Sequence, residues 1–178
     1  MIPKGTLCPL STADIDMIKA QAELRWKHDE EKGCEYTAYT NKTKQEAEQD
    51  SFGAEIAFCR LFGLEPDMQI GVYLPYDAIY RGVTIDVKQT DESWKGLDKK
   101  IKANNEKELY PQAYVLITGR LPFFVYRGAT LKEVFINENF IKPGAKPGWN
   151  SYYLLGQRYL LDLDVVVDEI LGEINEKF

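Results

Sequence analysis

Two aspartates and a lysine, Asp77, Asp86 and Lys88, are spaced so that a β-hairpin would bring all three onto one face. Residues 75–90 contain two short strand-like runs on either side of an Arg-Gly dipeptide at 81–82, which favours a turn. A turn at this dipeptide pairs residue 80 with 83, 79 with 84, 78 with 85 and 77 with 86. The two carboxylates are therefore expected to face each other across the hairpin.

Side-chain alternation divides this hairpin into an apolar face and a polar face. The apolar face, which would join the core, carries Tyr76, Ala78, Tyr80, Val83, Ile85 and Val87. The polar face carries Asp77, Ile79, Thr84, Asp86, Lys88 and Thr90. This register buries a continuous apolar surface and leaves the charged residues together.

Directly opposed residues in a hairpin have Cβ atoms about 5 Å apart, and like charges at that distance repel. A divalent cation between Asp77 and Asp86 would remove the repulsion, and oxygen-only ligands of this kind suit Mg²⁺ or Mn²⁺. Lys88 would lie beside the metal-bound water, where its amine could hold or deprotonate a nucleophile and pair with a phosphate. The alternative is a solvated strand face on which Lys88 only pairs with the two aspartates.

Composition excludes several other chemistries. The 178 residues carry 22 Lys and Arg against 28 Asp and Glu, a net charge of −6, and 44% are hydrophobic, which is ordinary for one folded domain. The single histidine, His28, excludes paired-histidine hydrolysis and multi-histidine metal centres. Neither G-x-x-x-x-G-K-[ST] nor G-x-G-x-x-G occurs. Catalysis would have to rest on carboxylates, lysines or hydroxyls.

Apolar periodicity predicts the elements that must position these residues. Helices are expected over 11–32, over 44–62 with Gly63 as the cap, and at the end of the chain, where Val166, Ile170, Ile174 and Phe178 form a stripe. Strands are expected over 70–74, 76–80, 83–90, 114–118 and 123–126, with 91–107 mostly helical, 142–149 a loop and 152–163 extended. Helices on both sides of a central mixed sheet make this an α/β or α+β fold.

We expect one domain. It would have a helical extension over about 1–43, a core over about 44–126 and a strand-helix elaboration over about 127–178. No apolar run approaches the roughly 20 residues of a membrane span, and the start of the chain lacks the apolar core of a signal peptide. The three cysteines form no C-x-x-C and are expected to be reduced thiols. A cytosolic protein that contacts no membrane is therefore expected.

The hairpin residues resemble the motif of the PD-(D/E)XK nuclease superfamily, which has the restriction-endonuclease-like fold. In that family a glutamate-bearing helix precedes a three-stranded sheet that carries the Asp and the (D/E)-x-K, and a helix and a further strand follow. Here Glu55 lies on the expected helix, Asp77 follows a Pro-Tyr dipeptide, and residues 86–88 supply the D-x-K. The likeness covers roughly residues 44–118.

The resemblance implies a role for each matching position. Asp77 and Asp86 would be metal ligands, Val87 would lend its carbonyl, Lys88 would be catalytic, and Glu55 would assist the metal or its water. The stretch after the D-x-K is locally basic, and DNA contacts are expected from Gln89, Lys95, Lys99, Lys100 and Lys102. A solvated helix face is the alternative for these lysines. Lys142, Lys146 and Trp149 form either a second contact or a plain surface loop.

Two features depart from the family's pattern or leave a choice open. The family's Pro-Asp is here Pro-Tyr-Asp, and a literal Pro-Asp stands upstream at 66–67. We prefer Asp77, because only this residue falls opposite Asp86 in a register that buries the apolar face; Asp67 would then cap a turn after the helix. Glu55 could instead be a boundary residue bonded to a neighbouring side chain. Of three [DE]-x-K triplets in the chain, only residues 86–88 lie on an expected strand with an opposed acid.

The function expected from these residues is a Mg²⁺- or Mn²⁺-dependent nuclease that hydrolyses DNA phosphodiester bonds by in-line attack of a metal-activated water. Such a compact enzyme would suit a phage, a mobile element or repair, and would be a homodimer if it cuts both strands. The alternative is a non-catalytic module that binds nucleic acid or protein on the same fold. A third reading is a hydrolase of small phosphoesters. The net charge of −6 opposes binding to nucleic acid, so local charge must provide it.

Overall fold

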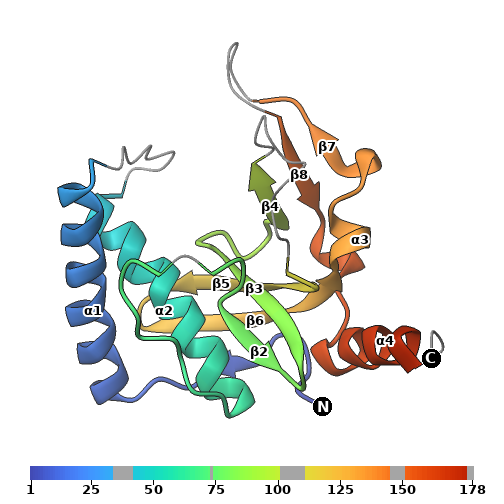
Figure 1. Cartoon of the computed structure of the whole chain (residues 1–178), viewed down its shortest axis with the longest axis horizontal. Helices are drawn as coiled ribbons and strands as arrows, with labels where there is room; N and C mark the ends of the chain where they lie inside the picture. Colours follow the sequence, from blue (N-terminus) through green and yellow to red (C-terminus); the bar gives the residue numbers. More distant parts are fainter. Residues whose placement is uncertain (34–41, 73, 101–110, 145–150, 176–178) are drawn as a thin grey trace.

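The computed structural model describes residues 1–33, 42–72, 74–100, 111–144 and 151–175. Over these residues the protein is mixed α/β, with a curled five-stranded mixed sheet, helices beside it and a small antiparallel sheet (Figure 1). The large sheet has the strand order β1-β6-β5-β3-β2, and the small sheet has the order β4-β8-β7. The expected combination of helices with a mixed sheet is thus confirmed.

The large sheet places the expected hairpin at one edge. It consists of β1 (Leu7–Cys8), β2 (Ala78–Tyr80), β3 (Val83–Thr90), β5 (Ala113–Arg120) and β6 (Phe123–Leu131). β3 and β5 run parallel, and the other neighbouring strands are antiparallel. The hairpin β2–β3 therefore has one open edge, on β2, while β3 lies inside the sheet.

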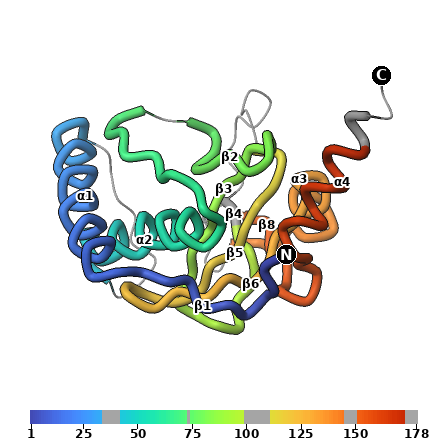
Figure 2. Tube along the Cα trace, turned by 90° about the horizontal axis from the view of Figure 1, so that it is seen from below, coloured from blue at the N-terminus to red at the C-terminus, as the bar shows by residue number. Residues whose placement is uncertain are grey.

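Two long helices lie side by side, and the second separates the first from the sheet (Figures 1 and 2). They are α1 (Thr12–Glu31) and α2 (Lys44–Phe62). Each begins with a capping box, Ser11 with Asp14 and Thr43 with Glu46, in which the first side chain accepts from the backbone and the acid bonds back. α2 ends at Gly63, whose φ of 68° fits the left-handed cap position. Both expected helices are confirmed.

The main core lies between α2 and one face of the large sheet. Ala54 and Phe58 of α2 pack with Val83, Ile85 and Val115 of the strands, and all five are fully buried. The alternation that predicted an apolar hairpin face is confirmed, because Val83, Ile85 and Val87 are the buried apolar residues of β3 and belong to the core cluster that contains α2. Burial of each large apolar side chain contributes roughly 1.5–3 kcal/mol.

The small sheet packs on the opposite face of the large sheet. It consists of β4 (Leu97–Lys100), β7 (Ile141–Lys142) and β8 (Tyr152–Leu155). Leu97 and Leu155 are fully buried against Tyr114 and Leu116 of β5, and Phe135 completes this second cluster. Figure 1 shows the small sheet standing above the large sheet in this view.

The remaining elements link these layers. They are α3 (Lys132–Phe135), two 3₁₀ segments (Glu138–Phe140 and Gln157–Tyr159) and α4 (Leu163–Asn175). α4 lies beside the hairpin turn, where the Tyr80 hydroxyl donates to Asp164 at 2.8 Å. Among the described helices, none combines the length and apolar character that crossing a membrane requires.

Several expected elements differ from the structure. Within 91–107, expected to be mostly helical, residues 97–100 form β4, because their backbone pairs with β8 some 55 positions later. The described residues of 70–74 form no strand, and Gly71 there has a φ of 75°. The strand expected over 76–80 covers only 78–80, and the extended stretch 152–163 is β8 followed by a 3₁₀ turn. Residues 145–149 of the expected loop lie outside the described residues, and residue 142 belongs to β7.

Candidate functional site

The hairpin β2–β3 has the register that the sequence predicts. Tyr80 pairs with Val83, residue 79 with 84 and residue 78 with 85. The turn uses positive φ at both central residues, 52° at Arg81 and 85° at Gly82, as a two-residue hairpin turn requires. The N–H of Asp77 donates to the carbonyl of Ile85 at 2.8 Å, the residue already paired with residue 78, so the pairing expected between 77 and 86 is not formed.

Asp77, Asp86 and Lys88 are brought together at the base of this hairpin. Oδ2 of Asp77 accepts from the backbone N–H of Val87 at 2.6 Å, which holds its carboxylate against the D-x-K segment. The Lys88 ammonium donates to Oδ1 of Asp86 at 2.5 Å, and Asp86 is buried. Among the described residues, each carboxylate thus uses one oxygen in these bonds and keeps its second oxygen for another partner.

Glu55 reaches the same region from α2. Its carboxylate lies 3.4 Å from Nη1 of Arg25, and its side chain is 20% exposed. Loss of hydration is the main reason that the pKa of Glu55 rises from 4.5 to about 7; Arg25 opposes the rise, and the charges of Glu48 and Asp86 add to it. The charge of Asp86 on the hairpin therefore acts on Glu55, which belongs to the neighbouring helix.

The charged groups of the hairpin also act on one another. Loss of hydration and then the charges of Glu55 and Asp86 raise the pKa of Asp77 well above its ordinary value, although Lys88 and the Val87 N–H oppose this. Burial lowers the pKa of Lys88, but Asp86, Asp77 and Glu55 outweigh burial, and the pKa is raised. Lys88 is thus a cation, and the charges of Glu55 and Asp86 disfavour ionisation of Asp77.

A cavity of about 270 Å³ opens beside these residues. Glu55 and Asp77 line it together with Arg25 and His28 of α1 and Asp67 of the segment that connects α2 to β2. Asp29 and Glu48 add to its acidic wall. The cavity is therefore more suited to a cation or a neutral polar group than to an isolated phosphate.

The other residues expected to contact DNA lie elsewhere. The Gln89 amide donates to Asp91 at 3.0 Å and to the Gly119 carbonyl at 2.6 Å, which ties it to the end of β5. Lys95 forms an ion pair with Asp98 at 3.1 Å. Lys99 and Lys100 stand on β4, but their side chains, and the whole of Lys102, Lys146 and Trp149, lie outside the described residues. The structure thus does not bring the Gln89 amide to the two hairpin aspartates, Asp77 and Asp86.

Asp67, the alternative aspartate, has the turn role expected of it. Its Oδ1 accepts from the backbone N–H of Gln69 at 2.9 Å, and its carbonyl accepts from Nη2 of Arg25 at 3.1 Å. This is the local side-chain-to-backbone bond that favours a turn after a helix.

Sequence reasoning missed Arg25. It pairs with Glu55, its guanidinium lies 4.0 Å from the centre of the Phe52 ring, and its Nε is buried without a hydrogen-bond partner among the described residues. A signal was present, because Arg25 follows the buried residues Ile18 and Ala22 at helical spacing. A cation on the buried stripe of one helix and an acid on that of the next indicate a contact.

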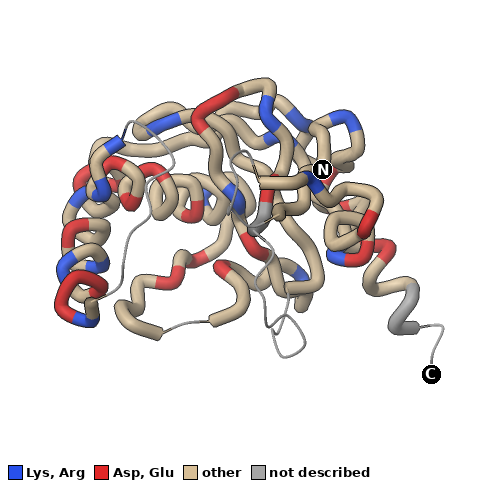
Figure 3. The backbone as a smooth tube through the Cα atoms, turned by 90° about the horizontal axis from the view of Figure 1, so that it is seen from above, with Lys and Arg blue, Asp and Glu red and all other residues tan. Residues whose placement is uncertain are grey.

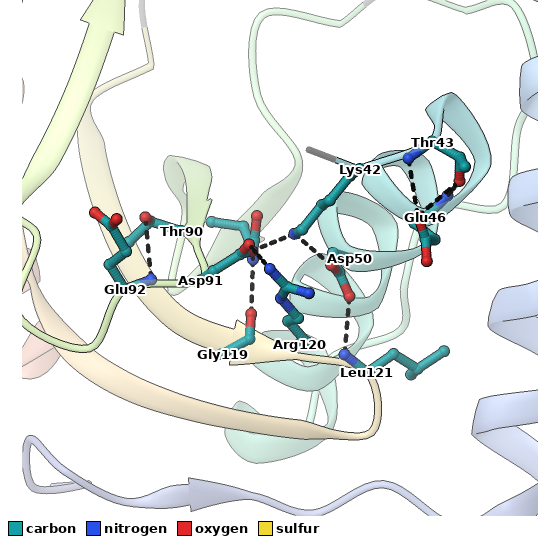
Figure 4. Close-up of polar contacts among 11 residues, drawn as sticks. Lys42, Thr43, Glu46, Asp50, Thr90, Asp91, Glu92, Gly119, Arg120 and Leu121 are labelled. Atoms are coloured by element: carbon teal, nitrogen blue, oxygen red, sulfur yellow. Dashed lines mark hydrogen bonds and ion pairs between the residues drawn. The ribbon is translucent and has the colours of Figure 1, made fainter. Parts of the chain in front are cut away.

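A second polar cluster, also missed, joins three segments at the far end of β3 (Figure 4). The ammonium of Lys42 lies between Asp50 of α2 and Asp91, which follows β3, and Arg120 pairs with Asp91 at 2.6 Å. Asp50 also accepts from the N–H of Leu121 at 2.9 Å. The side chains of Lys42 and Asp50 are both only 7% exposed, so this is a buried ion pair that fixes the start of α2 against the β5–β6 turn.

Metal binding by three side chains finds no support in the described part of the chain: no three His, Cys, Asp or Glu side chains there form a group that could hold an ion. Charged residues of both signs are interspersed along the trace (Figure 3). Any ion at the hairpin would therefore depend on the two aspartates together with backbone oxygens, water or a ligand.

Comparison with known proteins gives no match: no family model matches the chain, and neither does any curated protein or solved structure.

Proposed function

We propose that the protein is a metal-dependent nuclease of the PD-(D/E)XK type that hydrolyses DNA phosphodiester bonds at the base of the β2–β3 hairpin. The observation that carries the proposal is the convergence of Asp77 and Asp86 with Lys88 beside them. Two neighbouring carboxylates with only one amine paired to them destabilise the folded state unless a cation binds to them. The pKa of Asp77 is raised because its carboxylate loses hydration and lies near the charges of Glu55 and Asp86.

The donor set fits Mg²⁺ or Mn²⁺. The second carboxylate oxygens of Asp77 and Asp86, with the Val87 carbonyl, are hard ligands that would hold such an ion, and these metals usually take one or two carboxylates with waters and substrate phosphate oxygens. A bound divalent ion supplies Lewis-acid stabilisation of a phosphate and lowers the pKa of water. Glu55, paired with Arg25, would act on this ion from the neighbouring helix through its charge.

Lys88 would work as a cation rather than as a base. Its raised pKa keeps the amine protonated near neutral pH, where it can hold the phosphate under attack or the entering water in place. Its present partner, Asp86, keeps the ammonium at the polar face of β3. This refines the sequence expectation, in which the amine could also remove a proton.

The strand order supports the resemblance in part. A glutamate-bearing helix, the hairpin and a strand parallel to β3 follow one another, in α2, β2–β3 and β5. The match differs at two points. The segment that runs from α2 through the D-x-K contains two strands, β2 and β3, where the family has three. In addition, β4, followed by residues outside the described ranges, stands where the family has a helix.

The test is a cleavage assay with labelled single- and double-stranded DNA in Mg²⁺, Mn²⁺ or EDTA. We expect cleavage that requires the metal and that falls by about 10²–10⁴-fold in Asp86→Asn and in Lys88→Met. Asp16→Asn and Lys27→Met are matched controls, because they remove the same charges from exposed positions of α1. Metal-dependent cleavage that is unchanged in both site variants would refute this site.

A non-catalytic binding module is the second candidate, and the Lys88–Asp86 ion pair of 2.5 Å favours it, because a structural pair of this kind needs neither metal nor substrate. DNA binding without cleavage under any of these metals, together with a loss of folding stability in Lys88→Met, would support the module instead.

A further inference from the structure

The small sheet has one face in the core and one face directed away from it. Leu97 of β4 and Leu155 of β8 are buried, and Tyr153 packs against the same cluster. Because strand side chains alternate, Asp98 of β4 and residues 152 and 154 of β8 belong to the other face. The outward face of the small sheet is therefore set by the packing of its inward face.

Tyr152 stands in the middle of this outward face. It pairs with residue Lys100 of β4 on one side and with Lys142 of β7 on the other. Lys142 is exposed, and Tyr152 is partly exposed. Neighbouring positions across a sheet lie about 5 Å apart, so the Tyr152 ring lies beside the position of Lys142.

A second aromatic residue is presented on the turn before β4. The Trp94 side chain is 76% exposed, which is unusual for so large an apolar group. The Gln157 amide donates to the carbonyls of Ser93 at 2.7 Å and Lys95 at 2.6 Å, the residues on either side of Trp94. The indole is thus held outward on a fixed backbone.

Lys95 provides a cation beside Trp94. It follows Trp94 and forms an ion pair with Asp98 at 3.1 Å. Burial lowers the pKa of Lys95, but the charge and hydrogen bond of Asp98 and the charge of Glu92 outweigh burial, so the pKa is raised. We call Trp94, Lys95, Lys142 and Tyr152 the small-sheet patch.

This patch belongs to the same side of the large sheet as the hairpin aspartate and lysine. Asp86 and Lys88 pair in parallel register with Tyr114 and Leu116 of β5. Paired residues point to one face, and that face carries the small sheet through Leu97 and Leu155. The small sheet and the Asp86–Lys88 pair thus lie on one side of the large sheet.

We propose that the small-sheet patch binds single-stranded nucleic acid, with unpaired bases stacked on Trp94 and Tyr152 and phosphates paired with Lys95 and Lys142. Exposed aromatic rings with lysines beside them are the features that bind unpaired strands, because every base has a face to stack while its backbone carries negative charge. A duplex offers only its phosphates to this surface, since its bases are already stacked. The inference deepens the proposed function, on which it rests, by naming a single-stranded substrate.

The test measures binding separately from cleavage. The probe is a fluorescein-labelled 20-nucleotide single strand, titrated with protein in EDTA and followed by anisotropy, with the matching duplex alongside. We expect tighter binding of the single strand, which weakens about tenfold in Trp94→Ala and in Tyr152→Leu, is retained in Tyr152→Phe, and falls with salt. Lys142→Ala should weaken it several-fold.

Controls and outcomes keep the two proposals apart. Phe123→Leu and Lys132→Ala remove an exposed ring and a lysine elsewhere and should leave binding unchanged. Equal binding of strand and duplex, or binding that none of the patch variants changes, would overturn the inference. Binding that depends on the patch in a protein that does not cleave DNA would support the inference and refute the nuclease. Cleavage without patch-dependent binding would do the reverse.

Discussion

At the scale of the residue, the chemistry depends on charges that the fold holds close together. Loss of hydration and the charge of Asp86 raise the pKa values of Glu55 and Asp77, and the charges of Arg25 and Lys88, respectively, oppose the rise. The ordinary order of events in such a cluster is protonation at low pH and binding of a cation at high pH. Both can be measured as changes in folding stability.

Glu55 should make the protein less stable as the pH rises from about 4.5 to about 7. Its pKa is raised to about 7 in the folded chain, so between these values the unfolded chain has lost a proton that the folded chain keeps. We expect Glu55→Gln to gain about 2 kcal/mol relative to the parent between pH 4.5 and pH 8, as measured by urea unfolding. Glu133→Gln, at an exposed position, should show no such trend. A stability difference independent of pH would contradict the assignment.

Mg²⁺ should stabilise the protein more at pH 8 than at pH 5, because protons compete with the metal for the two aspartates. At a Mg²⁺ concentration ten times the dissociation constant, the expected gain is about 1.4 kcal/mol, seen as a rise in the melting temperature. The double variant Asp77→Asn/Asp86→Asn should lose this gain, and EDTA should reverse it in the parent. An equal gain in the double variant would place the ion elsewhere.

At the scale of the element, the site depends on how the hairpin and α2 are held. The hairpin turn fixes the pairing of residues 78–80 with 83–85, the Asp77 carboxylate bonds to the Val87 N–H, and α2 supplies Glu55 and the apolar side chains beneath β3. The buried cluster around Lys42 joins the start of α2 to the segment after β3 (Figure 4). Both devices can be weakened without touching the proposed ligands.

Lys42→Met should destabilise the protein by about 3 kcal/mol in urea unfolding, because it leaves the buried carboxylate of Asp50 without its cation, whereas Asp91 keeps Arg120. Adding Asp50→Asn to this variant should cost less than the sum of the two single changes, since the uncompensated charge is gone. Lys27→Met, whose pair with Glu23 is exposed, should cost under about 0.5 kcal/mol. Additive losses would show that Lys42 and Asp50 do not act as a pair.

Gly82→Ala should cost about 1 kcal/mol, because its φ of 85° is unfavourable for any residue with a Cβ, although no atom lies within 4 Å of the added methyl. Gly172→Ala is the matched control: the space is equally open, but the backbone is helical, so the same change should stabilise by about 0.5–1 kcal/mol. Thermal unfolding of the two variants measures both effects. Equal effects would mean that the turn conformation costs nothing.

At the scale of the whole molecule, two sheets share one layer of side chains. Leu97 and Leu155 of the small sheet are buried against the large sheet, so the small-sheet patch is positioned by core packing. The net charge is −6, but positive and negative residues are interspersed along the chain. A polyanion would therefore have to bind through a local group of basic residues.

Leu155→Ala should remove that anchorage and destabilise the protein by about 2–5 kcal/mol in urea unfolding, because it empties a fully buried site. Leu161→Ala, at an exposed position, provides the comparison and should cost less than about 0.5 kcal/mol. If the two losses were equal, the small sheet would not be held by its buried leucines.

The sequence alone determined what depends on neighbours along the chain. Capping residues and a 3.6-residue apolar stripe predicted α1 and α2, and two-residue alternation with an Arg-Gly turn predicted the pairing of residues 78–80 with 83–85. Only the tertiary structure decided what depends on distant partners. The charged stretch before Lys100 became a strand because β8 offers it backbone bonds, and Arg25 and Lys42 acquired roles because helices and turns far apart in sequence bury their charges together. Periodicity records which face a residue occupies, whereas long-range pairing is set by which surfaces the completed core brings into contact.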